Sequence, residues 1–160
     1  MILPDLLDKN LNIVFCGMAA SKKSAELKGY YAGPGNKFWK ALYESKLTPN
    51  IIDPSDYTLL LNYKIGLTDI SKEDYGNDNE LNKHLFDPDR LKSSIITYQP
   101  KLLVFNGKMA AKIYFNKDRV DYGIQDNYIS QTQIYICPST SGAANAFWDM
   151  NIWKELINYI

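Results

Sequence analysis

Three short apolar runs predict buried strands in this chain. They lie at residues 11–16 (LNIVFC), 101–106 (KLLVFN) and 133–137 (QIYIC). The first two are nearly continuous apolar tracts, which is typical of strands in a parallel sheet that is covered on both faces. A weaker pattern at Lys64–Thr68 predicts one more strand. We therefore expect a buried sheet of four strands.

Helical patterns fill the intervals between these strands. Phe38, Trp39 and Leu42 recur at the spacing of one helix face. Because helices and strands alternate, we predict a three-layer α/β/α sandwich around a mainly parallel four-stranded sheet. The expected helices are Asn36–Ser45, Asp56–Tyr63, Pro88–Tyr98, Gly107–Phe115 and Ala146–Tyr159, and the expected loops are Ser71–Asn82, which is exposed, and Asp121–Gln131, which leads into a hairpin with the last strand.

The composition is that of an ordinary globular protein. Of the 160 residues, 46% are apolar and 22% are charged, and this length is typical of a single domain, here 1–160. No apolar run approaches the length of a membrane span, and the first residues lack the pattern of a signal peptide. We expect a monomeric, cytoplasmic protein of bacterial or archaeal type with no membrane contact.

The cysteine and histidine content restricts the chemistry. Cys16 and Cys137 are too few for a four-thiolate iron–sulfur cluster or a Cys-rich zinc site. Each ends an apolar run, so we interpret both as buried free thiols. His84 stands alone in an acidic, exposed stretch, which argues against a histidine-based metal site. We expect no metal and no cofactor.

Three loops that follow predicted strands indicate where a ligand binds. They are residues 17–36, 66–70 and 138–145. The carboxyl ends of parallel strands meet at one edge of a sheet, so these loops are expected to gather there. The net charge is zero, but residues 21–46 hold six lysines against two glutamates. Lysines, tyrosines and small residues in one loop are suited to binding nucleic acid. Taken one at a time, these features also have structural explanations, namely turns, helix caps and solvent-exposed lysines.

The segment from Gly17 to Lys40 resembles the mismatch-specific uracil-DNA glycosylases. Those enzymes carry G-I-N-P-G after a strand, then an aromatic residue, then H-P-A-N-R-F-W. This chain has GMAAS at 17–21, Tyr31, and GPGNKFW at 33–39, without a gap. Their second motif, N-P-S-G followed by a wedge residue, is similar to STSG at 139–142. The resemblance implies a base pocket at the strand ends of a four-stranded parallel sheet, and a monofunctional DNA glycosylase of base excision repair.

The chain departs from this family at the residue that holds the attacking water. The family's first-motif asparagine is replaced by Ala19, whose side chain has no polar atom. Asn36 matches the asparagine of H-P-A-N-R-F-W, a block in which relatives that act on hypoxanthine also carry an asparagine. Asp69 follows another strand and is the second candidate, as general base or as a stabiliser of the sugar cation. For each of the two, a helix-capping role is the alternative.

The resemblance also implies how the remaining candidates meet double-stranded DNA with a mismatched or deaminated base. Tyr31 would stack on the flipped base. With Ala143 at the wedge position, Phe147 or Trp148 would fill the gap in the stack, unless both are core residues. The expected base contacts are Gly17, Met18, Ala19, Ala20 and Ser24, with Ser24 also a candidate for phosphate; the expected DNA contacts are Lys22, Lys23, Lys37, Ser139, Thr140, Ser141, Gly142 and Asn145.

Other functions stay open at this point. A DNA-binding protein of the same fold that has lost catalysis is the main alternative, because Ala19 replaces the catalytic asparagine. A serine hydrolase is disfavoured, because the serines lack the G-x-S-x-G setting and His84 is the one histidine. A nucleotide-binding module is disfavoured because both glycine-rich phosphate motifs are missing. The sequence leaves the base undecided among uracil, hypoxanthine, xanthine and mismatched thymine.

Overall fold

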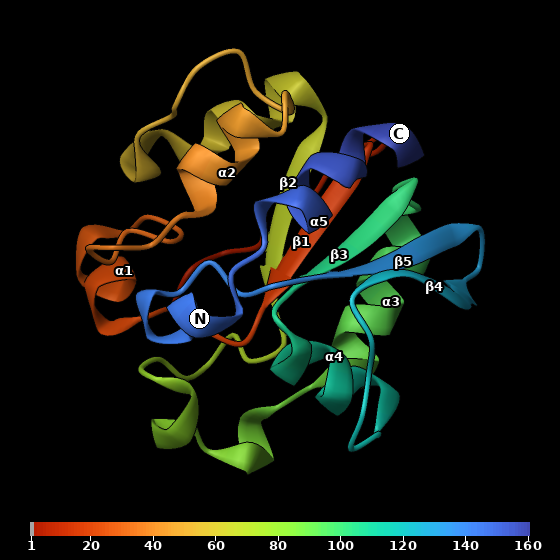
Figure 1. Cartoon of the computed structure of the whole chain (residues 1–160). Helices are drawn as coiled ribbons and strands as arrows, with labels where there is room; N and C mark the ends of the chain where they lie inside the picture. The colour runs from red at the N-terminus through yellow and green to blue at the C-terminus, as the bar shows by residue number, and fades with distance from the viewer. Residues whose placement is uncertain (1) are drawn as a thin grey trace.

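A five-stranded, mostly parallel sheet forms the centre of the protein. The computed structural model describes residues 2–160, and Figure 1 shows helices on both sides of the sheet. The strand order is β2-β1-β3-β5-β4, and only the β4–β5 pair is antiparallel. The strands are β1 (Ile13–Gly17), β2 (Ile65–Asp69), β3 (Leu102–Asn106), β4 (Gly123–Ile129) and β5 (Thr132–Cys137).

Alternating side chains of β1 enter two separate cores, one on each face of the sheet. Ile13 and Phe15 pack into the first core, and Val14 and Cys16 pack into the second. Every residue of β1, β2 and β3 is buried. The apolar runs therefore predicted these strands correctly, because a strand covered on both faces has no polar side. Both cysteines are buried free thiols, as expected.

Two groups of helices cover the two faces. The first core holds α2 and α5, and the second holds α3 and α4 (Figure 1). Helix α3 starts as predicted, at Pro88 after Asp87, whose carboxylate accepts a hydrogen bond from the Arg90 amide. The α-helices are α1 (Lys22–Leu27), α2 (Phe38–Glu44), α3 (Pro88–Tyr98), α4 (Lys108–Phe115) and α5 (Met150–Lys154); the 3₁₀ helices are η1 (Pro54–Tyr63), η2 (Asp78–Glu80), η3 (Lys83–Leu85), η4 (Gly142–Phe147) and η5 (Glu155–Tyr159). Among residues 2–160, no helix is long and apolar enough to cross a membrane.

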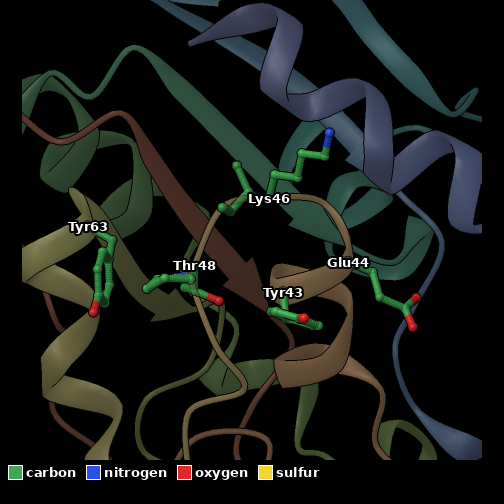
Figure 2. A pocket seen from close by; sticks show the side chains of 7 residues that line it. Tyr43, Glu44, Lys46, Thr48 and Tyr63 are labelled. Carbon is green, nitrogen blue, oxygen red and sulfur yellow. The ribbon is translucent and has the colours of Figure 1, made fainter.

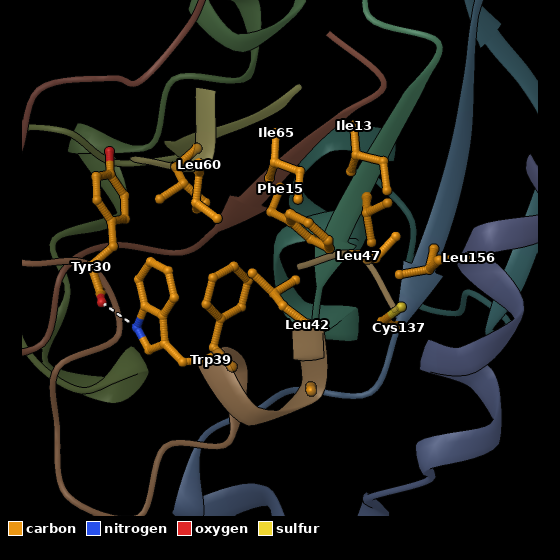
Figure 3. Close-up of a cluster of buried hydrophobic side chains, with 14 of the residues drawn as sticks. Ile13, Phe15, Tyr30, Trp39, Leu42, Leu47, Leu60, Ile65, Cys137 and Leu156 are labelled. Carbon is orange, nitrogen blue, oxygen red and sulfur yellow. Dashed lines mark hydrogen bonds between the residues drawn. The ribbon is translucent and has the colours of Figure 1, made fainter. Parts of the chain in front are cut away.

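Aromatic rings in the first core connect α2 and α5 to the sheet. The Phe15 ring lies 5.3 Å from that of Phe38 and 5.5 Å from that of Trp153, between ring centroids. The indole N–H of Trp39 donates to the backbone oxygen of Tyr30 at 3.0 Å (Figure 3). Phe38 and Trp39 thus fix both α2 and the loop that precedes it against β1.

The prediction of a four-stranded sheet was wrong by one strand. Residues 121–131, expected as a loop, contain β4, which pairs with β5 at the edge of the sheet. Six of the seven β4 positions are half-buried or exposed, and four of these are glycine or polar residues, so no apolar run marks the strand. An edge strand needs only one neighbour and little burial, which explains why the hydrophobic pattern missed it.

Three helix predictions also need correction. The closing helix expected over 146–159 is divided into η4, α5 and η5, because Trp148 adopts an extended backbone conformation and Asp149 caps a new helix. The segment expected as a helix over 56–63 is the 3₁₀ helix η1. Helix α1 lies in what was expected to be an irregular loop, and Ser21 caps it by accepting from the Ser24 amide.

Candidate active site

Polar residues stand at the carboxyl ends of neighbouring parallel strands. Gly17 ends β1 beside Asp69, which ends β2, and Asn106 ends β3 on the other side of β1. Tyr31 and Thr140 join them from the loops that follow β1 and β5. We call these five residues the strand-end site. The topology therefore brings parts of the segments 17–36 and 138–145 to one edge of the sheet, as the sequence predicted, but residues 66–69, expected as a loop, form the end of β2.

Tyr31 reaches the strand-end site through an unusual backbone conformation. Its φ is 53°, in the left-handed region, which costs an aromatic residue about 1–3 kcal/mol. Ser24 holds the loop in place, because its buried hydroxyl oxygen accepts from the Ala32 amide at 3.0 Å. One face of the Tyr31 ring stacks on Phe38 at a centroid distance of 4.1 Å. The Tyr31 ring is half-buried, and Ser24 acts from inside the protein.

The Tyr31 hydroxyl lies over Gly17, next to a carboxylate oxygen of Asp69. A Cβ at position 17 would lie 2.9 Å from Asp69 Oδ1 and 3.0 Å from the Tyr31 hydroxyl oxygen. Only glycine therefore leaves these two oxygens in place. The hydroxyl is buried and makes no hydrogen bond of ordinary geometry among residues 2–160. Burial raises the pKa of Tyr31 well above its ordinary value and the negative Asp69 adds to this rise, although the Asn106 side chain is near enough to lower this pKa in part.

Asp69 is a buried carboxylate paired with a buried lysine. Asp69 is 3% exposed, and its Oδ2 lies 3.2 Å from the Lys72 ammonium nitrogen. Burial raises the pKa of Asp69, and the Lys72 charge opposes part of this rise. A carboxylate with a raised pKa is a better proton acceptor, which is the property that a general base needs. The alternative role as a helix cap is not seen, because no helix begins at Asp69.

Sequence reasoning missed two of the residues that build this site. Lys72 lies in the segment 71–82, interpreted as an exposed polar loop, yet Ser71 and Lys72 are both buried. Asn106 ends an apolar strand just as Asp69 does, and that signal was sufficient to find it. Its side-chain amide donates to the Thr140 hydroxyl at 2.9 Å, and its oxygen accepts from the Thr140 amide at 3.0 Å.

The second motif is held against the first by its backbone. The Thr140 carbonyl accepts from the Lys37 amide at 2.9 Å, and Thr140 itself is 1% exposed. Ser139 and Ser141 are half-buried, and each hydroxyl oxygen accepts from a backbone amide two residues ahead. Their O–H groups stay available as donors. Thr140 is thus a structural link, and the two serines remain candidates for phosphate contact.

The candidates in the G-P-G-N-K segment are engaged with neighbouring residues. The Asn36 side-chain oxygen accepts from the Phe38 amide at 3.0 Å; Asn36 thus supports the start of α2 from one residue before Lys37, which occupies the cap position itself. The Asn36 amide group is left as a donor. The Lys37 ammonium group contacts the side-chain oxygen of Asn145 and lies 5.4 Å from the Trp148 ring centroid. Lys37 and Asn145 therefore join the two motif loops.

The remaining candidates divide between the surface and the interior. Lys22 and Lys23 are exposed on the first turn of α1, and Gly142 is exposed in η4. Met18 and Ala20 are buried, whereas Ala19 is half-exposed. The backbone oxygens at 17, 18 and 20 accept from the amides at 70, 71 and 76. The first-motif loop is consequently fixed to the segment that carries Asp69.

A surface groove of about 700 Å³ lies away from these residues. Tyr43 and Glu44 at the end of α2 line it together with Lys46, Thr48 and Tyr63 (Figure 2). None of the strand-end site residues contributes to this groove. It therefore has no part in the arrangement around Asp69.

The amino-acid sequence of the chain matches a known protein family. The family model of the uracil DNA glycosylase superfamily matches residues 4–157. The chain belongs to the uracil DNA glycosylase superfamily. The strand-end site contains Gly17 of the segment 17–21 and Thr140 of the segment 139–142, whereas Ala19 lies outside it.

A solved structure shows the same fold. The solution NMR structure of a protein from Methanosarcina acetivorans, provisionally named a uracil DNA glycosylase, aligns with a TM-score of 0.65. The two sequences are 22% identical, and the match covers 97% of this chain and 96% of the other. At this identity the likeness concerns the fold, which extends over almost the entire chain.

Proposed function

We propose that this protein is a monofunctional DNA glycosylase that removes a deaminated base from DNA in base excision repair. The substrate is uracil, with hypoxanthine, xanthine or mismatched thymine as further candidates. Superfamily membership supports the activity. The observation that carries it for this chain is the Asp69 carboxylate beside Gly17, where the first motif itself offers only Ala19.

Asp69 is the group that activates water in this proposal. Ala19 has no polar side-chain atom, so the first motif cannot orient the nucleophile. The N-glycosidic bond breaks toward an oxocarbenium-like sugar, and the bonding electrons leave with the base. The water oxygen bonds to C1′ while Asp69 Oδ1 accepts its proton. A negative carboxylate also stabilises the sugar cation as it forms.

Asn36 is the second candidate for this role. Its side-chain oxygen is already occupied by the Phe38 amide, which leaves the N–H₂ group to contact water or the base. A group that only donates cannot accept the proton of the attacking water. We therefore assign Asn36 to orientation and Asp69 to proton transfer.

The base is held by stacking and by the polar groups of the strand-end site. Tyr31 stacks on the flipped base, a contact worth about 1–3 kcal/mol. The backbone at 17–20 supplies hydrogen bonds to the base edge, whereas the Tyr31 hydroxyl, in the plane of its own ring over Gly17, is placed to contact the sugar or the attacking water. An enclosed donor without a partner has a cost that a substrate contact removes.

The DNA backbone meets lysine and hydroxyl groups around this site. Lys22 and Lys23 are free to approach phosphates, and the O–H groups of Ser139 and Ser141 are free to donate to them, with Gly142 allowing close approach. Lys37 and Asn145 approach the duplex as a joined pair. A monomer carries all of these groups.

Phe147 fills the space left by the flipped nucleotide. Its side chain is 68% exposed, whereas Trp148 is half-buried and lies 6.0 Å from Trp153 between ring centroids. An apolar side chain gains by entering the base stack. We therefore assign the wedge role to Phe147 and a packing role to Trp148.

A catalytically silent DNA-binding protein is the second candidate function, and Ala19 is the observation that favours it. Strand cleavage after alkali distinguishes the two. Labelled duplexes with uracil opposite guanine, hypoxanthine opposite thymine and thymine opposite guanine are incubated with the wild type, Asn36→Ala and Asp69→Ala. Cleavage of one duplex by the wild type supports the glycosylase, whereas binding without cleavage of any of them supports the silent protein.

A further inference from the structure

The ammonium group of Lys72 is buried between the carboxylates of Asp69 and Asp5. Its side chain is 3% exposed and lies 3.2 Å from Asp69 Oδ2 and 3.3 Å from Asp5 Oδ1. The ammonium also donates to the Tyr30 hydroxyl at 2.7 Å. Two hydrogen bonds, to Asp69 and Tyr30, and the ion pair with Asp5 therefore hold Lys72 in one position.

Arg90 closes this cluster from the opposite side. Its guanidinium lies 2.8 Å from Asp5 Oδ2 and donates to the Asp69 backbone oxygen at 2.5 Å. The cluster therefore holds two carboxylates, Asp5 and Asp69, and two cations, Lys72 and Arg90. Its charges balance, which allows both carboxylates to stay ionised in the interior.

The two carboxylate oxygens of Asp69 have different surroundings. Oδ2 contacts Lys72, whereas Oδ1 faces Gly17 and the Tyr31 hydroxyl and receives no hydrogen bond from residues 2–160. A carboxylate held by one oxygen presents the other with a fixed direction. The free oxygen points to the place where the proposed chemistry occurs.

We propose that Lys72 is a positioning residue that holds the Asp69 carboxylate ionised and turned with Oδ1 toward the strand-end site. This inference rests on the proposed glycosylase function and deepens it. Lys72 touches neither base nor sugar and acts only through Asp69. Asp5 is its counterpart, since it shares the ammonium group and balances its charge.

The charges around Asp69 predict shifts of opposite sign in the pH profile. The ionised carboxylate is the active form, so the acid limb of kcat/KM follows the pKa of Asp69. Lys72 and Arg90 lower this pKa, and Asp5 raises it, against the larger rise due to burial. Tyr30, Tyr31 and Cys16 also face this group, and all three are neutral near pH 7 because their own pKa values are raised. Lys72→Met therefore moves the acid limb to higher pH, and Asp5→Asn moves it to lower pH.

The experiment measures single-turnover release of uracil from a uracil–guanine duplex between pH 5 and pH 9 (about the range in which duplex DNA stays paired). The variants are Lys72→Met, Asp5→Asn, Asp69→Asn and the double variant Asp69→Asn/Lys72→Met, each checked for folding by circular dichroism. A general base accelerates the reaction by about 10²–10⁴-fold. We expect Lys72→Met to lose less activity than Asp69→Asn. The rate of the double variant should match that of Asp69→Asn within about twofold, because the effects of substitutions are not additive when one residue acts through the other.

Each outcome decides between a positioning and a merely structural role. The inference is supported if the acid limbs of Lys72→Met and Asp5→Asn move in opposite directions and the double variant is no slower than Asp69→Asn. Unmoved limbs, or limbs that move in the same direction, overturn it, as does a further loss in the double variant. If Lys72→Met does not fold, Lys72→Gln replaces it, and an Asp5→Asn limb that stays in place overturns the inference by itself. A wild type without activity contradicts the proposed function instead.

Discussion

Phe147 provides a direct test of how the protein would bind duplex DNA. A fully buried Phe side chain gains about 1.5–3 kcal/mol over an exposed one. Since 68% of Phe147 is exposed in the free protein, entry into the base stack gains about two-thirds of this, or ~1–2 kcal/mol. At about 1.4 kcal/mol per factor of ten, Phe147→Ala reduces kcat/KM on a duplex by about 5–30-fold.

The assay compares a uracil–guanine duplex with a single strand that contains uracil. A single strand has no partner base and no gap to fill, so Phe147→Ala should release uracil from it at the wild-type rate. The free energy of unfolding should stay within about 0.5 kcal/mol, because the side chain is exposed. Ile96→Ala is the matched control: Ile96 is 46% exposed on α3, and its truncation should change neither rate. Equal losses on duplex and single strand, or no loss on the duplex, would refute the wedge role.

Two further substitutions test the geometry of the strand-end site. Gly17→Ala places a Cβ 2.9 Å from Asp69 Oδ1 and should lower the free energy of unfolding by about 1–3 kcal/mol and remove most of the activity. Gly33→Ala is the control, because its Cβ meets only an ordinary 3.8 Å contact and should be tolerated. Equal effects of the two substitutions in thermal unfolding and strand cleavage would contradict this. Tyr31→Phe removes a buried hydroxyl without a partner, so chemical denaturation should show stability that is unchanged or up to about 1 kcal/mol higher, while uracil release slows. A clear loss of stability in Tyr31→Phe would show that the hydroxyl is paired inside the protein.

The sequence predicted those parts of the fold that depend on burial. Apolar runs identified the central strands, because successive residues such as Val14 and Phe15 are buried on opposite faces of the sheet. The edge strand β4 lacked this signal, since most of its side chains face solvent. Trp148 interrupts the closing helix although nothing in its own apolar pattern marks a break.

The strand-end site was predictable only as far as its residues follow strands directly. Gly17 and Asp69 were found because each ends a strand, and Asn106 was within reach of the same reasoning. Lys72 was not, because its partner Asp5 lies far away in the sequence and only the fold brings the two together. A lysine in an acidic, polar segment has the pattern of an exposed residue, and the pairing that allows its burial is a property of the tertiary structure.

The most direct test of the central claim is single-turnover base release by Asp69→Asn. The substrate is an end-labelled duplex with one uracil opposite guanine, cleaved with alkali after incubation, and binding is measured in parallel. We expect cleavage by the wild type and a loss of about 100-fold or more in Asp69→Asn, with duplex binding retained. Wild-type binding without cleavage, or full activity in Asp69→Asn, would contradict the claim that Asp69 supplies the chemistry that Ala19 cannot.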